Sequence, residues 1–282
     1  MFKTLIDPSA LADHLADDRW VIVDCRFDLA DPPKGERLYR ESHIPGARYA
    51  HLDRDLSGDQ TGTNGRHPLP TADQMRERFG ALGIGPGTQV VAYDTDSGMY
   101  AARLWWMLRF MGHETVAVLD GGFARWTDEG RPVRGGAEQW HSASFRGAPR
   151  SDWLIDAARI VADLHYPTPV LVDARAESRF RGENETIDRA AGHIPGARSF
   201  FFQRNLTPEK RFRSIEELKA EWLALLGGTP PHDAVMYCGS GVSACHNLLA
   251  LEHAGLTGAR LYSGSWSEWS SSPERPIATG GP

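Results

Sequence analysis

The sequence predicts an α/β protein made of two similar domains, each with a mostly parallel sheet and helices on both faces. Two observations carry this prediction. Short apolar runs alternate with helical stretches along the chain, which is typical of parallel sheets covered on both faces. The same alternation, with several of the same short motifs, occurs twice within 282 residues.

Matching segments define the two halves. Residues 21–26 (VIVDCR) recur as 170–175 (VLVDAR), and residues 43–48 (HIPGAR) recur unchanged as 193–198. The period is domain-sized, which indicates a duplicated domain and not a solenoid. Between the halves the chain is rich in Gly, Arg and Pro and has no clear period. We therefore predict an N-terminal domain over residues 1–135, a linker over 136–151 and a C-terminal domain over 152–282.

The elements follow from apolar runs and from residues typical of helix ends. Asp7 and Asp156 stand where side chains cap the first turn of a helix, and Gly112 and Gly255 stand where helices stop. Apolar runs predict strands in the first half at 20–24, 89–94 and 115–119, and in the second half at 170–173, 234–237 and 260–262.

A cysteine between the last apolar run but one and the following helix is the strongest chemical signal. Cys238 begins the loop Cys-Gly-Ser-Gly-Val-Ser, which covers residues 238–243. Two glycines allow a tight turn whose backbone N–H groups, with the positive end of the helix, can favour a thiolate. A thiolate is the reactive form of cysteine. We therefore predict that Cys238 is a nucleophile.

The first half differs at this place. Its corresponding loop follows Tyr93 and carries Asp94 where the second half has Cys238. A carboxylate cannot perform the chemistry of a sulfur nucleophile, and its charge would repel an anionic substrate. The N-terminal domain is therefore expected to be non-catalytic, and Cys25 and Cys245 are expected to be packed as small apolar residues.

Composition limits the classes of partner and compartment. The formal net charge of −6 argues against a general nucleic-acid or anionic-membrane partner. The N-terminus has no apolar signal core, and no stretch is long enough to span a membrane. The three cysteines form neither a disulfide set nor metal-type pairs. We expect a cytoplasmic protein with no metal and no organic cofactor.

Several motifs together resemble the two-domain rhodanese superfamily of sulfurtransferases. These are the paired HIPGA segments, DGGFARW at 120–126, GSWSEW at 264–269 and the Cys238 loop. The resemblance covers nearly the full chain. The loop is more similar to the Cys-Gly-Ser-Gly-Val-Thr of 3-mercaptopyruvate sulfurtransferases than to the basic Cys-Arg-Lys-Gly-Val-Thr of thiosulfate-type rhodaneses.

The resemblance implies roles for residues outside the loop. By position, Ser240, His67 and Asp53 form a relay that moves protons, although Asp55 remains an alternative to Asp53. Arg179 matches an arginine that binds the substrate carboxylate.

Further substrate contacts are implied less directly. Arg189 is offered as a second carboxylate ligand, although the segment 183–188 departs from the family's spacing by a residue. The loop residues that would contact substrate are Gly239, Gly241, Val242 and Ser243.

The implied reaction transfers sulfur from 3-mercaptopyruvate through a Cys238 persulfide to cyanide or to a thiol acceptor such as thioredoxin or a small thiol. Thiosulfate:cyanide sulfurtransfer is the alternative within the family. Two other classes stay open: a cysteine phosphatase, which would need an arginine where Ala244 stands, and a non-catalytic sulfur carrier or binding module.

Overall fold

The computed structural model describes residues 1–183 and 185–281, and it divides into two compact units. The first unit contains residues 1–58, 69–150 and 208–212, and the second contains 59–68, 151–207 and 213–282. The units thus differ from the contiguous domains expected from the repeat. Residues 59–68 pack with the second unit, and residues 208–212 pack with the first.

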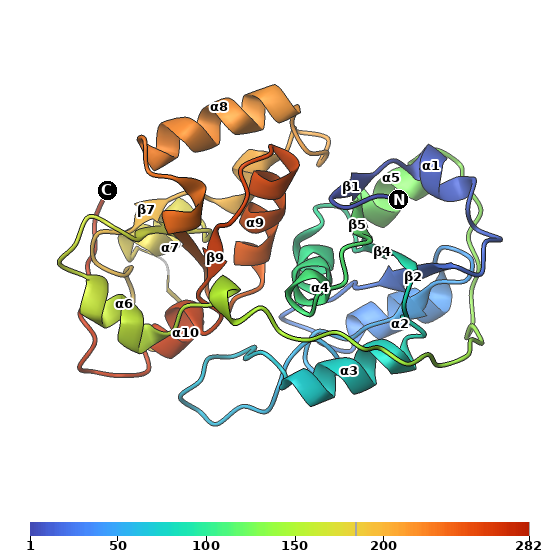
Figure 1. The fold of residues 1–282 in the computed structure, drawn as a ribbon, viewed down its shortest axis with the longest axis horizontal. Coiled ribbons are helices and arrows are strands. Elements are labelled where there is room, and N and C mark those ends of the chain that lie inside the picture. Colours follow the sequence, from blue (N-terminus) through green and yellow to red (C-terminus); the bar gives the residue numbers. More distant parts are fainter. Residues whose placement is uncertain (184, 282) are drawn as a thin grey trace. The chain divides into compact units, whose positions relative to one another are not determined.

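The first unit is a five-stranded parallel sheet with the strand order β1-β5-β4-β2-β3 (Figure 1). Its elements are β1 (Leu5–Ile6), α1 (Pro8–Ala12), β2 (Trp20–Asp24), α2 (Lys34–Glu41), β3 (Arg48–Tyr49), α3 (Ala72–Ala81), β4 (Gln89–Tyr93), α4 (Met99–Phe110), β5 (Val116–Leu119) and α5 (Gly122–Asp128).

The second unit has a four-stranded parallel sheet in the order β7-β6-β8-β9. Its elements are η1 (Ser151–Trp153), α6 (Ala157–Asp163), β6 (Val170–Asp173), α7 (Glu177–Arg181), β7 (Arg198–Ser199), η2 (Phe202–Asn205), α8 (Ile215–Leu226), η3 (Pro231–Asp233), β8 (Ala234–Tyr237), α9 (Ser243–His253), β9 (Arg260–Leu261) and α10 (Ser265–Trp269).

The four strands of the second sheet follow the same order as β5, β4, β2 and β3 of the first. A parallel bridge between Leu154 and Leu261 stands where β1 pairs with β5 in the first unit. In each unit the strand that carries the loop of interest, β4 or β8, lies in the sheet interior, and a helix, α4 or α9, follows it. The duplicated parallel-sheet fold predicted from the sequence is therefore confirmed.

Each unit has its own apolar core. In the second unit this core includes the fully buried rings of Tyr237, Trp266 and Trp269. The first unit has Tyr93 and Trp126 at corresponding places. These aromatic residues belong to the cores of the two units, as their repetition indicates.

Two histidines occupy equivalent structural positions. His43 stacks on Tyr39 with ring centroids 4.2 Å apart, and its Nδ1 lies 2.6 Å from the Tyr39 carbonyl oxygen. His193 stacks on Phe180 at 3.7 Å, and its Nδ1 lies 2.7 Å from the Phe180 carbonyl oxygen. Since the same arrangement occurs in both units, these residues serve the architecture.

Candidate active site

Cys238 lies at the carboxyl end of β8, in the turn that leads to α9. The turn requires Gly241, whose φ is +75° and whose Cα faces the Ser263 carbonyl group. Ser240 and Val242 are buried, and Ser243 is the first residue of α9. The Cys238 side chain is also almost wholly buried, with 2% of its surface exposed. The loop therefore presents a shielded thiol at the edge of the sheet where the parallel strands end.

Ser265 fixes the backbone at Cys238, a role that sequence reasoning missed. The Cys238 N–H donates to Ser265 Oγ at 3.0 Å, and the Ser265 hydroxyl donates to the Tyr262 carbonyl oxygen at 2.9 Å. Ser265 has a φ of +55°, whereas Gly122 has a φ of +60° at the corresponding place in the first unit. Ser265 therefore adopts a conformation that favours glycine, and its hydroxyl makes two hydrogen bonds that glycine could not make.

Replacing Ser265 separates the hydroxyl from the backbone strain. Ser265→Ala loses both hydrogen bonds and keeps the strain, so we expect the free energy of unfolding to fall by about 2 kcal/mol. Ser265→Gly relieves the strain and should cost less than half as much. Urea denaturation measures both. Equal stability of the two variants and the wild type would contradict a positioning role for the hydroxyl.

The first-unit loop shows what its backbone N–H groups bind. Asp94, at the place of Cys238, accepts hydrogen bonds from the N–H groups of Gly98 and Tyr100, both at 2.8 Å, and of Ala101 at 3.4 Å. Burial raises the pKa of Asp94 to about 6, and the backbone donors oppose that rise. The loop is thus an anion cradle occupied by a carboxylate of its own chain.

The Cys238 loop has the same position relative to its helix as the Asp94 loop, but the Cys238 side chain is shorter than that of Asp94. Helix α4 begins at Met99 and α9 begins at Ser243, each six residues after the last residue of its strand. The hydrogen bond that the structure assigns to the Cys238 backbone N–H is the one that it donates to Ser265 Oγ. The amide cradle around the sulfur therefore stays a prediction, which the first unit supports by analogy.

His67 and Ser240 lie together, as the resemblance implied. His67 Nδ1 is 2.7 Å from Ser240 Oγ, and both side chains are buried. His67 reaches the loop because residues 59–68 belong to the second unit. Asp53 belongs to the first unit, where its N–H donates to His51 Nδ1 at 3.1 Å, so its place in the relay stays a prediction. The alternative, Asp55, accepts the His51 N–H at 2.7 Å.

Two guanidinium groups approach Gly239, the residue next to the thiol. A Cβ atom at Gly239 would lie 2.9 Å from Arg66 Nη2 and 3.6 Å from Arg179 Nη1. An added Cβ would therefore displace the end of the Arg66 side chain, whereas the distance to Arg179 is an ordinary contact. The sequence motif that contains His67 also contains Arg66, but nothing in the sequence assigned Arg66 to the site.

Buried carboxylates hold the inner edges of both guanidinium groups. Arg179 Nη2 contacts Glu185 Oε2 at 2.9 Å and Asp188 Oδ2 at 2.8 Å, and Arg66 Nη1 contacts Asp188 Oδ1. Arg179 Nη1 and Arg66 Nη2 have no hydrogen-bond partner among the described residues. Both of these N–H groups lie near Gly239, so they are available to an anion beside Cys238.

The structure places Arg189 away from this pair. Its side chain is exposed, and Nη1 donates to the Ser271 carbonyl oxygen at 3.0 Å. The preceding turn closes on Glu185, whose Oε1 accepts the N–H groups of Ile187 and Asp188, both at 2.9 Å. This turn directs Arg189 toward the loop at 271. The second cation near Gly239 is therefore Arg66 and not the expected Arg189.

The other cysteines are packed as expected. Cys25 is buried in the first unit, and burial raises the pKa of its thiol well above the ordinary value. Cys245 is buried on α9, where its sulfur lies 3.3 Å from the Gly241 carbonyl oxygen. Ala244, where a phosphatase would have its arginine, is buried as well. Neither cysteine has the surroundings of a reactive thiol.

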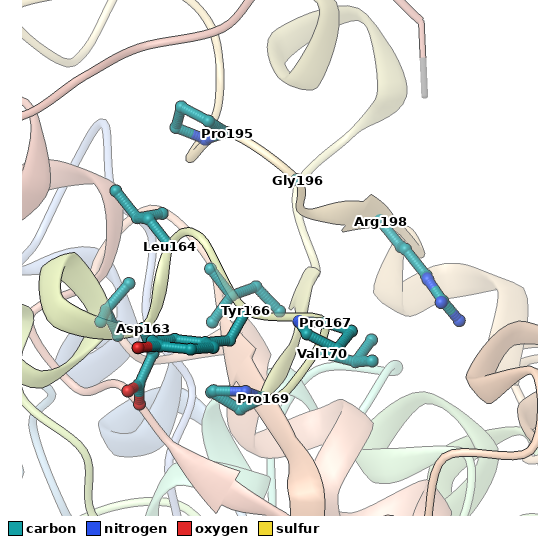
Figure 2. A pocket seen from close by; sticks show the side chains of 11 residues that line it. Asp163, Leu164, Tyr166, Pro167, Pro169, Val170, Pro195, Gly196 and Arg198 are labelled. Carbon is teal, nitrogen blue, oxygen red and sulfur yellow. The ribbon is translucent and has the colours of Figure 1, made fainter.

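A cavity of about 230 Å³ lies at the end of the second sheet where strand β6 begins, opposite the end where β8 leads into the Cys238 loop (Figure 2). Val170, the first residue of β6, lines it together with Pro169, Pro195 and Arg198. Cys238 follows the last residue of β8, and β6 and β8 are parallel. The cavity therefore does not contain the thiol.

Among the residues that the structure describes, no helix has the length and apolar character needed to cross a bilayer. Within the same residues, no group of His, Cys, Asp and Glu side chains is arranged to hold a metal ion.

Comparison with known proteins gives a consistent family. The model of the rhodanese-like domain matches residues 7–129 and 156–272. A protein of Pseudomonas aeruginosa described as "Probable 3-mercaptopyruvate sulfurtransferase" is 47% identical, over 98% of each chain. A "Putative thiosulfate sulfurtransferase SseB" of Mycobacterium tuberculosis is 35% identical, over 99% of this chain and 98% of its own.

A solved structure agrees with these relatives. The 3-mercaptopyruvate sulfurtransferase from Leishmania major superposes with a TM-score of 0.86 at 32% identity, and the match covers 98% of this chain and 76% of that one. The two matched domains, the two parallel sheets and the relatives over nearly the whole length lead to one assignment: this chain belongs to the rhodanese family, as a protein with two rhodanese-like domains.

Proposed function

We propose that this protein is a sulfurtransferase that takes sulfur from 3-mercaptopyruvate and holds it as a persulfide on Cys238. The observation that carries the proposal is the pair of N–H groups on Arg66 and Arg179 beside Gly239, which have no hydrogen-bond partner among the residues that the structure describes. A planar guanidinium suits a carboxylate, and two of them near the thiol would hold the substrate carboxylate while its sulfur faces Cys238.

The reaction would proceed in two covalent stages. The Cys238 thiolate attacks the substrate sulfur and forms a sulfur–sulfur bond, while the substrate carbon–sulfur bond breaks. The electron pair of that bond remains on the leaving pyruvate as its enolate. Ser240 would supply a proton to this enolate, with His67 as the proton source behind it, 2.7 Å away. The products are pyruvate and a Cys238 persulfide.

The second stage would return the enzyme to its starting state. A thiolate acceptor, such as thioredoxin or a small thiol, or cyanide attacks the outer sulfur, and the Cys238 thiolate leaves. The N–H groups of the loop before α9 would stabilise the persulfide, as the corresponding groups hold the Asp94 carboxylate in the first unit. Such a route predicts ping-pong kinetics.

Thiosulfate sulfurtransfer is the second candidate, because a relative at 35% identity carries that name. Both activities would use the same thiol and persulfide. The loop favours 3-mercaptopyruvate, because Gly239 and Ser240 add no cations that would attract a dianion, and Gly239 leaves room for the Arg66 guanidinium group beside the loop. Initial rates with the two donors separate the candidates. A higher kcat/KM for thiosulfate would overturn the proposed donor.

The role of Arg66 can be tested against Arg189 as a matched control. Arg66→Gln removes one cation from the carboxylate site, so we expect kcat/KM for 3-mercaptopyruvate to fall by about 10- to 100-fold, mainly through a higher KM. Arg189→Gln makes the same change in net charge at an exposed position and should stay within twofold of the wild type. The reverse order of the two variants would contradict this assignment.

A further inference from the structure

The arginines near the thiol belong to an ion-pair network without net charge. In the part of the chain that the structure describes, its salt bridges join three arginines to three carboxylates. The members are Arg66, Arg175, Arg179, Asp173, Glu185 and Asp188. Their charges cancel, so the two guanidinium groups at Gly239 do not create a strongly positive site.

Asp188 is the member shared by the two guanidinium groups that approach Gly239. One carboxylate oxygen contacts Arg66 and the other contacts Arg179, the second at 2.8 Å. Its side chain is 2% exposed, so solvent screens its charge poorly. Glu185 stands behind it, 3% exposed, and contacts Arg179 and Arg175. Asp188 is therefore the carboxylate best placed to influence an anion that binds Arg66 Nη2 and Arg179 Nη1 beside Gly239.

We infer that Asp188 determines which charge of sulfur donor the site accepts, by limiting the positive field of Arg66 and Arg179 to a level that suits a singly charged carboxylate. The inference rests on the proposed function, because it concerns the anion that approaches Cys238. With Asp188 ionised, a monoanion gains two directed guanidinium contacts. A dianion finds the same contacts but no net positive charge to match its second charge.

Removal of the Asp188 charge should therefore favour dianions selectively. A change of one unit in the charge of the site acts twice as strongly on a dianion as on a monoanion. At an effective dielectric typical of a partly buried site, the difference corresponds to a change in relative affinity on the order of tenfold. If loss of the ion pairs with Asp188 made the two arginine side chains less ordered, the binding of both anions would weaken together. The ratio of the two affinities therefore reports the effect of charge.

The test uses protection of Cys238 and requires no sulfur transfer. Iodoacetamide is uncharged, so its rate of alkylation at Cys238, followed by peptide mass, measures occupancy of the site by pyruvate, a monoanion, or sulfate, a dianion. Titration of each anion at constant ionic strength gives two dissociation constants. Since no donor is consumed, a failure of the proposed sulfurtransferase activity would not alter this readout.

Asp188→Asn is expected to raise the ratio of the pyruvate dissociation constant to the sulfate dissociation constant by about tenfold. Glu183→Gln is the matched control, because Glu183 lies on the same segment but is exposed and pairs with Arg181. It should leave the ratio within twofold. Glu185→Gln removes a charge from the network at a second position and should raise the ratio, which decides the matter if Asp188→Asn does not fold.

Three results would overturn the inference. One is a ratio for Asp188→Asn, or for Glu185→Gln in its place, within twofold of the wild type. Another is an equal rise for Glu183→Gln, which would indicate a general charge effect. The third is no protection of the wild type by either anion, since the arginines would then form no anion site.

Discussion

Cys238→Ser is expected to lower kcat/KM for 3-mercaptopyruvate by roughly 10⁴-fold or more, because the hydroxyl of serine cannot form a persulfide. The loop, the buried His67–Ser240 pair and the two arginines would all remain in place. Substrate binding should therefore change much less than turnover. Steady-state kinetics with 3-mercaptopyruvate and a thiol acceptor measure the loss of turnover. The rise in melting temperature on addition of pyruvate, which does not depend on cysteine reactivity, measures binding to the site.

Cys25→Ala is the matched control for this loss. Cys25 is buried after β2, and Ala174 occupies the corresponding place after β6. The fold therefore accommodates alanine at this position, so activity should stay within twofold of the wild type. If activity survived in Cys238→Ser but disappeared in Cys25→Ala, the nucleophile would be Cys25, in the N-terminal half, and the assignment to Cys238 would be wrong.

Gly241→Ala is expected to reduce the free energy of unfolding by about 3 kcal/mol or more. The residue has a φ of +75°, and an added Cβ would lie 2.3 Å from the Ser263 carbonyl oxygen. A backbone atom cannot rotate away as a flexible side chain can, so the loop must distort. Urea denaturation measures the loss, and distortion of the loop should also reduce the reactivity of Cys238.

Gly255→Ala separates backbone conformation from contact. Gly255 has nearly the same φ, +76°, but nothing lies within 4 Å of the added Cβ. Its cost should therefore be only about 1 kcal/mol, the usual penalty of a left-handed residue other than glycine. If both alanine variants were equally stable, the close approach between the Cys238 loop and Ser263 would not constrain the fold.

The sequence predicted the parts of the fold that depend on local pattern and repetition. The strands at 20–24, 170–173 and 234–237 have the predicted bounds, because each is a buried apolar run between polar segments. The two-residue strands β3 and β7 were not predicted. Each is held by pairing with a neighbour, β2 or β6, and its own sequence has no apolar period.

The candidate site also combines features that a local pattern or the repeat predicts with features that depend on tertiary contacts. The tight turn around Cys238 follows from its glycines, and the relation to Asp94 follows from the repeat. Arg66 and Asp188 were missed because their roles depend on residues 59–68 packing against the second unit, a tertiary contact that no local pattern encodes. Ser265 was missed because its signal is a positive φ, which the sequence does not report.

The mass of the protein after incubation with 3-mercaptopyruvate, without an acceptor, tests the central claim most directly. The account predicts one added sulfur atom per chain, located on the peptide that contains Cys238, with release of one equivalent of pyruvate and loss of the added mass on treatment with cyanide. An unchanged mass, or sulfur located on Cys25 or Cys245, would contradict it.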